Sequence, residues 1–270
     1  MSLGEESVRE KNVKIIISPA KKMQVESDVM ESVGTPWLLE ETRRVLAVMQ
    51  GFSREELKRI FKANDRITEE NYQRYREMDL ARGLTPAVLA YSGLAFSNMA
   101  PQVFTDGQWD YVKRNLKILS GFYGILNALD GVVPYRLEMQ AKVAIDGKRD
   151  LYEFWGNRIY RILADEVRAE SAGEDGRVIL NLASKEYSRV IEPFVEEDIR
   201  FVTCVFAEYV DGKLVTKGTK AKMARGQMVS FLAKENAVTL EKVKEFRELG
   251  FVWQEKLSSD GQFVFVESKG

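Results

Sequence analysis

Short apolar runs separated by polar segments predict a set of buried strands. Residues Val13–Ile17 are mostly β-branched, and Ser18-Pro19 directly after them predicts that this strand leads into a loop. Asp211-Gly212, between two strand-like runs, is the strongest short-range signal for a β-hairpin. The other predicted strands cover residues 87–91, 178–182, 201–210, 213–216, 251–254 and 263–266, the last two as a terminal hairpin.

Helices are predicted where apolar residues repeat about every 3.6 positions. Ser53 and Glu56 form a capping box at the start of one such helix. Thr35 as the cap and Pro36 at the first helical position predict the start of an earlier one. Further helices are expected from about residue 68 and over residues 109–119, 125–129, 151–170, 221–234 and 240–249.

Strands and helices follow one another irregularly, without the steady βαβ succession that predicts a purely parallel sheet. The chain of 270 residues has no linker rich in Pro, Gly or Ser and no internal repeat. We therefore predict a single compact α/β domain (mixed α+β) over residues 13–268, with a mixed sheet surrounded by helices. Residues 1–12 are expected to be a disordered lead-in or a cloning remnant.

Composition narrows the chemistry, because the chain contains no histidine and one cysteine, Cys204. A Ser-His-Asp triad, a histidine zinc site and an intrachain disulfide are excluded, and we predict no metal site and no cofactor. No apolar run approaches the ~20 residues of a membrane span, so we expect a cytoplasmic protein without membrane contact. The net charge of −1 argues against a globally basic nucleic-acid binder but not against a local basic patch.

The loop after the first strand is the first candidate site. Open α/β sheets bind ligands at the carboxyl ends of their strands. Ser18, Lys21 and Lys22 lie at such an end, and the two lysines are suited to holding a phosphate. The alternative is a turn with two solvated lysines.

Two glycines that flank two aromatic residues form the second candidate. Ser120, Gly121, Tyr123 and Gly124, with an expected helix on each side, resemble the hairpin of helix-hairpin-helix DNA-binding modules. In those modules glycines let backbone N–H groups approach a phosphate, and Lys113 adds positive charge nearby. The alternative is a tight connection between two helices in which glycine supplies a positive φ.

Two further polar clusters are typical of a binding cleft. Arg136 and Glu138 are two residues apart on an extended segment, so both face one side, where Glu138 would orient Arg136 toward a phosphate. Asn181, Ser184 and Tyr187 follow a buried strand and offer groups for proton transfer without histidine. The alternatives are a structural ion pair and a helix cap at Ser184.

Basic residues dominate residues 213–234, which contain no acidic residue. Lys222 and Arg225 share one face of the expected helix, and Lys220 lies just before it. A basic face at a helix N-terminus attracts phosphate through both side-chain charge and backbone N–H groups. The alternative is a solvated basic face.

Six segments, in this order, resemble the YaaA family of peroxide stress resistance proteins, and together they span residues 13–266. They are Ile16-Ile17-Ser18-Pro19-Ala20-Lys21, Leu119-Ser120-Gly121-Phe122-Tyr123-Gly124, Leu129-Asp130 with residues 134–139, Leu151-Tyr152-Glu153-Phe154-Trp155-Gly156, residues 181–187, and Ala221-Lys222-Met223-Ala224-Arg225-Gly226. After the second expected strand some members carry Gly-Asp-Val-Tyr. This chain has Gly93-Leu94-Ala95-Phe96 there, so no role is carried over to that Asp or Tyr.

The resemblance implies a cytoplasmic bacterial α/β protein with a basic cleft and a helix-hairpin-helix element. It implies sequence-independent binding of duplex or distorted DNA during hydrogen peroxide stress, and protection against damage from intracellular iron. By position it places Lys21, residues 120–124, Arg136, Lys222 and Arg225 in the cleft. The alternative function is an enzyme acting on a nucleotide or DNA-end phosphate in that cleft. Direct iron sequestration would rest on carboxylates such as Glu196-Glu197-Asp198.

Overall fold

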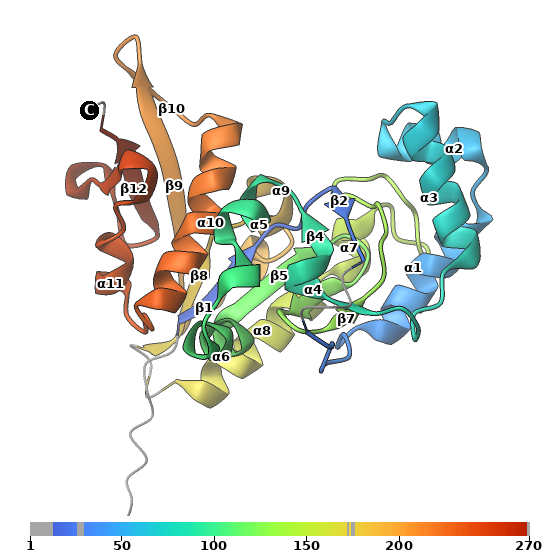
Figure 1. Ribbon diagram of the computed structural model, residues 1–270, viewed down its shortest axis with the longest axis horizontal. Helices are drawn as coiled ribbons and strands as arrows, with labels where there is room; N and C mark the ends of the chain where they lie inside the picture. The colour runs from blue at the N-terminus through green and yellow to red at the C-terminus, as the bar shows by residue number, and fades with distance from the viewer. Residues whose placement is uncertain (1–12, 26–29, 172, 174–175, 269–270) are drawn as a thin grey trace, which may run out of the picture.

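Figure 1 shows the computed structural model, which describes residues 13–25, 30–171, 173 and 176–268. The predicted lead-in at residues 1–12 lies outside the described residues. Within the described ranges, eight strands form one mixed sheet in the order β11-β12-β9-β8-β1-β5-β6, with β10 paired to β9. Helices surround this sheet, so the predicted α/β class with a mixed sheet is confirmed.

The centre of the sheet is parallel and its edges are antiparallel. β1 (Val13–Ile17) pairs in parallel with β5 (Leu116–Ser120) and with β8 (Val178–Asn181), and all three strands are buried. The parallel set continues through β9 (Arg200–Val210) and β12 (Gln262–Glu267). The antiparallel strands are β6 (Gly124–Asn127), β10 (Lys213–Val215) and β11 (Phe251–Trp253). Short pairs join β2 (Lys22–Met23) to β4 (Tyr91–Ser92) and β3 (Thr85–Pro86) to β7 (Gly131–Val132).

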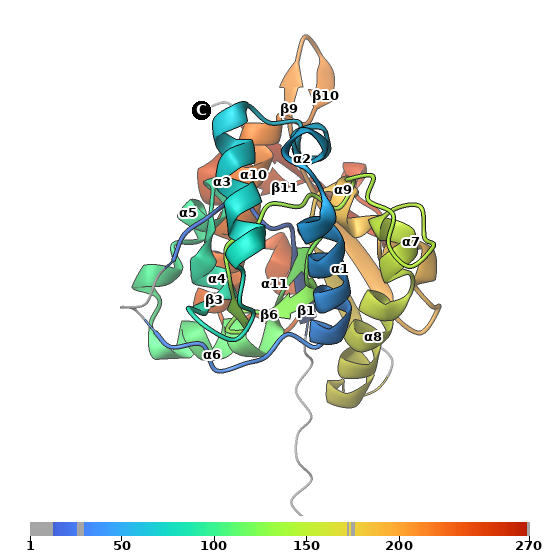
Figure 2. The ribbon, with the colours of Figure 1, turned by 90° about the vertical axis from the view of Figure 1, so that its right-hand side faces the viewer.

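Helices cover both faces of the sheet. Figure 2 shows α5 and α6 on one side and α7 and α8 on the other. The α-helices are α1 (Leu39–Gly51), α2 (Arg54–Phe61), α3 (Asp65–Glu77), α4 (Ala87–Ala90), α5 (Leu94–Met99), α6 (Asp106–Asn115), α7 (Leu151–Trp155), α8 (Arg158–Glu170), α9 (Lys185–Ser188), α10 (Gly218–Lys234) and α11 (Leu240–Lys244). Short 3-10 turns cover Pro101–Val103, Glu192–Phe194, Glu248–Gly250 and Glu255–Leu257. Across the described residues, no helix combines the length and the apolar character needed to cross a membrane.

Predictions from short sequence motifs are confirmed where a few neighbouring residues decide the structure. Ser53 and Glu56 form the predicted capping box of α2, with both reciprocal hydrogen bonds present. The predicted hairpin of β9 and β10 is also confirmed, and Asp211 (φ 49°) and Gly212 (φ 75°) both adopt the positive φ that this turn requires. The terminal hairpin is confirmed in the antiparallel pair of β11 and β12.

Tertiary contacts override several other predictions. Residues 87–91 were expected as a strand, but they begin with the buried helical turn α4, because a short apolar run suits a buried helix equally well. The helix expected over residues 151–170 is two helices, divided at Gly156 with φ 51°. The helix expected to start at Pro36 begins at Leu39, after the isolated bridge of Gly34 with Asp130 and a turn at residues 37–38.

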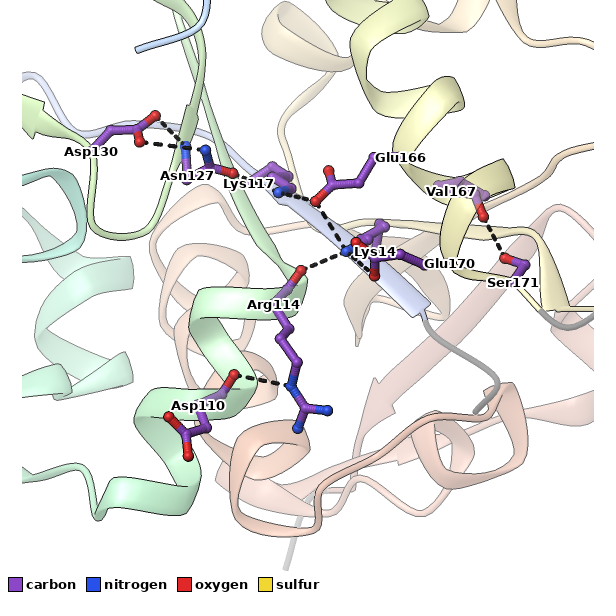
Figure 3. Close-up of polar contacts among 10 residues, drawn as sticks. All are labelled: Lys14, Asp110, Arg114, Lys117, Asn127, Asp130, Glu166, Val167, Glu170 and Ser171. Atoms are coloured by element: carbon purple, nitrogen blue, oxygen red, sulfur yellow. Dashed lines mark hydrogen bonds and ion pairs between the residues drawn. The ribbon is translucent and has the colours of Figure 1, made fainter. Parts of the chain in front are cut away.

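A buried ion network fastens α8 to the centre of the sheet (Figure 3). Lys14 on β1 and Lys117 on β5 have side chains with 0% and 1% exposure. The Lys117 Nζ atom lies 2.6 Å from Glu166 Oε1, and the Lys14 Nζ atom lies 3.2 Å from Glu166 Oε1 and 2.7 Å from Glu170 Oε2. Lys117 also donates to Asn127 Oδ1 at 2.6 Å. Burial lowers the pKa of Lys117, whereas the charge of Glu166 raises it.

Candidate functional site

The segment from Ser120 to Gly124 is the turn of a β-hairpin between β5 and β6. The predicted helix-hairpin-helix is therefore wrong, because a strand stands on each side of the two glycines. The turn is buried, and Ser120 Oγ accepts hydrogen bonds from the backbone N–H groups of Phe122 (3.1 Å) and Tyr123 (2.8 Å). These donors are thus satisfied inside the protein and do not face an external phosphate.

The two glycines of this turn serve close packing. A Cβ atom on Gly121 would lie 2.6 Å from the backbone oxygen of Leu137. A Cβ atom on Gly124 would lie 2.9 Å from a methyl group of Leu38 and 3.0 Å from the ring of Trp155. The glycine pattern therefore reflects the density of the core around the hairpin.

The carboxyl ends of β1 and β8 form the topological switch point of the sheet. From β1 the chain returns to the sheet at β5, whereas from β8 it continues to β9 on the opposite side. Open α/β sheets bind ligands in the crevice at such a point. Ser18 and Ser184 meet here: Ser18 Oγ accepts from the Ser184 backbone N–H at 2.8 Å and donates to Ser184 Oγ at 3.2 Å. Asn181 donates to Thr203 Oγ1 on β9 at 3.1 Å.

A charged triplet lies beside this switch point. The exposed Lys21 places its Nζ atom 3.0 Å from Oε1 of Glu138, and Arg136 Nη2 lies 3.2 Å from the same oxygen. Arg136 and Glu138 are largely buried, with 13% and 8% of their side chains exposed. The predicted pairing of Arg136 and Glu138 is thus present, and Lys21 from the first candidate loop joins it.

Two further groups near the triplet, Glu186 and Tyr187, have raised pKa values and therefore keep their protons to a higher pH than usual. Burial raises the pKa of Glu186, and the charge of Glu138 raises it further. Burial also raises the pKa of the Tyr187 phenol well above its ordinary value. Ser184 is the N-cap residue of α9, but its side chain makes no capping hydrogen bond. A raised phenol pKa keeps Tyr187 neutral, so Tyr187 is not poised as a base.

A pocket of about 580 Å³ opens from this triplet toward α2. Its lining combines cations, carboxylates and apolar side chains from three parts of the chain: Lys21, Phe52, Glu56, Arg59, Ile60, Phe61, Lys62, Glu138, Gln140, Ala141 and Lys142. Four cations face two carboxylates, so the pocket carries a positive balance in a chain of net charge −1. This arrangement is suited to an anion.

Comparison with known proteins identifies the family. A family model described as "Peroxide stress protein YaaA" matches residues 13–257. The chain belongs to the YaaA family. Similar relatives are the UPF0246 protein of Agathobacter rectalis, 49% identical over 94% of this chain and 98% of the relative, and that of Desulfitobacterium hafniense, 47% identical over 95% and 98%. The UPF0246 protein of Pediococcus pentosaceus is 42% identical over 95% and 99%. The resemblance to a family of peroxide stress proteins is thus confirmed.

The other predicted basic residues of this YaaA-family chain do not line the pocket. Lys22 lies exposed on β2, and Lys113 lies exposed on α6, 3.5 Å from Asp110. Lys222 is exposed on α10, while Arg225 of the same helix is partly buried. The Arg225 Nε atom is buried and has no hydrogen-bond partner among the described residues. Burial lowers the pKa of the Arg225 guanidinium.

The basic charge at the start of α10 is offset by acids from the sheet. Lys217 and Lys220 both pair with Glu208 on β9, and Lys220 also pairs with Glu267 on β12. Sequence neighbours alone suggested an unbalanced basic surface, because these two carboxylates come from distant segments. Lys220 is therefore engaged in holding α10 against the sheet.

Acid should weaken the ion pairs that hold α10 against the sheet. The two lysines hold the pKa of Glu208 at about 2, below its ordinary 4.5. The stability that Glu208 contributes is therefore fully present above pH 4.5 and is lost as the pH falls toward 2. We expect Glu208→Gln to flatten the fall of the urea unfolding midpoint over this range. Equal acid sensitivity in the parent and the variant would contradict this role.

Sequence reasoning missed most of the pocket wall. Arg59, Lys62 and Lys142 are exposed cations on segments that looked like ordinary solvated surface. One signal was available in the sequence: Lys58, Arg59 and Lys62 are closely spaced basic residues at the end of α2. Across the part of the chain that the structure describes, no group of three or more Asp, Glu or Cys side chains is arranged to hold a metal ion.

Proposed function

We propose that this chain binds the phosphate backbone of DNA without sequence preference, through the basic pocket and the surface at its mouth. One observation carries the proposal: Lys21, Arg59, Lys62 and Lys142 converge on one hollow from three separate segments. Cations gathered in this way release counterions from DNA on binding, which supplies affinity without reading bases. Within the peroxide stress response, the bound protein would limit damage to DNA from intracellular iron.

Fluorescence anisotropy with two unrelated duplexes of equal length tests the proposal. We expect equal affinity for both, with a logarithmic salt slope of about −0.9 per neutralised phosphate. Arg59→Ala and Lys62→Ala should each weaken both duplexes alike and reduce the salt slope by about 1. Cleavage of the same DNA by ferrous iron and peroxide should fall as the protein is added, and less so with the two variants.

Lys113→Ala is the matched control. Lys113 is exposed and basic, and the sequence predicts that it binds phosphate, but it lies outside the pocket lining. The proposal predicts nearly unchanged affinity for this variant. It fails if the parent does not bind duplex DNA at low salt, or if Lys113→Ala weakens binding as much as Lys62→Ala.

A further inference from the structure

Glu138, which lines the pocket, has a carboxylate oxygen that lacks a donor in the described part of the chain. Both cations that contact Glu138 do so through Oε1, Lys21 at 3.0 Å and Arg136 at 3.2 Å. Glu138 Oε2 is buried and has no hydrogen-bond partner among the described residues. A buried carboxylate oxygen without a donor is costly, so it favours a ligand that brings an N–H or O–H group.

The rest of the pocket offers the complementary features. Phe52, Ile60 and Phe61 supply an apolar wall on the α2 side. The exposed cations Arg59 and Lys62 belong to the same segment and lie at the same hollow. The volume of about 580 Å³ falls within the roughly 300–1,000 Å³ typical of small-molecule sites. A ligand that fits must combine a flat apolar part, a negative charge and a hydrogen-bond donor.

We propose that the pocket binds a nucleoside phosphate as a small molecule, with the Glu138 carboxylate accepting a hydrogen bond from the base or the sugar. The base would lie against the wall formed by Phe52 and Ile60, and the phosphate would be held by Arg59 and Lys62. This inference deepens the proposed function because it uses the same pocket, which makes the nucleotide and DNA competing ligands.

Calorimetric titration with adenosine monophosphate, and separately with inorganic phosphate and adenosine, tests this inference. We expect the parent to bind the nucleotide at least tenfold more tightly than either fragment. Glu138→Gln should lower nucleotide affinity at least tenfold, because the uncharged amide oxygen is a weaker acceptor than a carboxylate. The same variant should leave phosphate affinity equal or higher, because a negative charge beside the cations is gone. These opposite changes separate ligand contact from general damage to the pocket.

Two further variants keep the test decisive. Arg59→Ala, an exposed change on the other wall, should weaken both the nucleotide and inorganic phosphate. Glu77→Gln removes an exposed carboxylate of α3 outside this pocket lining and should change neither affinity. Thermal melts of each variant confirm folding. Nucleotide binding no tighter than phosphate binding, or unchanged in Glu138→Gln, overturns the inference.

The DNA measurements distinguish this inference from the proposed function. DNA binding without any nucleotide binding overturns the inference and leaves the proposed function standing. Nucleotide binding without DNA binding supports the inference and contradicts the proposed function. Where both ligands bind, the nucleotide should displace DNA from the parent, and Glu138→Gln should require at least tenfold more nucleotide for the same displacement.

Discussion

Replacement of Gly226 by alanine is expected to destabilise the protein by about 1–3 kcal/mol or more. Gly226 is a buried residue of α10 at its contact with α5. A Cβ atom there would lie 1.9 Å from the backbone oxygen of Ala95 and 3.0 Å from the backbone nitrogen of Met99. Backbone atoms cannot rotate away, so the two helices would have to separate. This loss must also exceed the gain of about 1 kcal/mol that alanine brings inside a helix.

Gly218→Ala provides the matched control in the same helix. A Cβ atom on Gly218 would meet no other atom within 4 Å, so this change should be neutral or stabilising. Urea unfolding of both variants measures the contrast. Similar unfolding midpoints for Gly226→Ala and Gly218→Ala would show that α10 and α5 are not held at the described distance.

Replacement of Glu166 by glutamine is expected to cost about 3–5 kcal/mol of unfolding free energy, because it leaves two buried lysines short of their shared counter-charge. Glu166 Oε1 contacts both Lys14 and Lys117. The pKa of Lys117 in the folded state is already lowered from its ordinary 10.5 by burial. Between that lowered pKa and 10.5 the unfolded chain binds more protons at this lysine, so the contribution of Lys117 to stability rises with pH. Loss of Glu166, whose charge raises that pKa, should steepen the rise.

Urea unfolding across a pH series up to about 10 measures both the loss of unfolding free energy and its slope against pH. Asp165→Asn is the matched control, because it removes an exposed carboxylate from the same helix. A second change, Lys117→Met in the Glu166→Gln background, should restore part of the lost stability by removing one uncompensated charge. Equal stability of Glu166→Gln and Asp165→Asn would mean that the buried network does not hold α8 in place.

Local chemistry made part of the fold predictable from sequence. The strand Val13–Ile17, the Ser53 capping box and the Asp211-Gly212 turn each depend on a few neighbouring residues, and all three are confirmed. The segment around Ser120 shows where neighbouring residues are not enough to predict the structure. The apolar run Leu116–Ser120 directly follows α6, so its pattern extends that of the helix, and pairing with the distant strand β1 decides the outcome.

The candidate site was predictable in the same partial way. Lys21 and Glu138 were selected because each lies in a polar motif, and the structure brings them within 3.0 Å of each other. Arg59 and Lys62 gave no such motif, because their position beside Lys21 depends on how α2 packs across the pocket. For residues 213–234, the count of charges along the sequence predicted more positive charge than the structure leaves unpaired. It overlooked Glu208, which neutralises lysines from another element.

The central position of β1 has a consequence for protein synthesis. This apolar strand leaves the ribosome well before its partner strands, because Ile15 pairs with Leu116 and Val13 with Val178. Pairing over such sequence separations is slow, and it cannot begin until about a hundred further residues have been made. The nascent chain therefore exposes an aggregation-prone segment until β5 and β8 have emerged. Translation speed and access to chaperones should therefore affect the yield of folded protein.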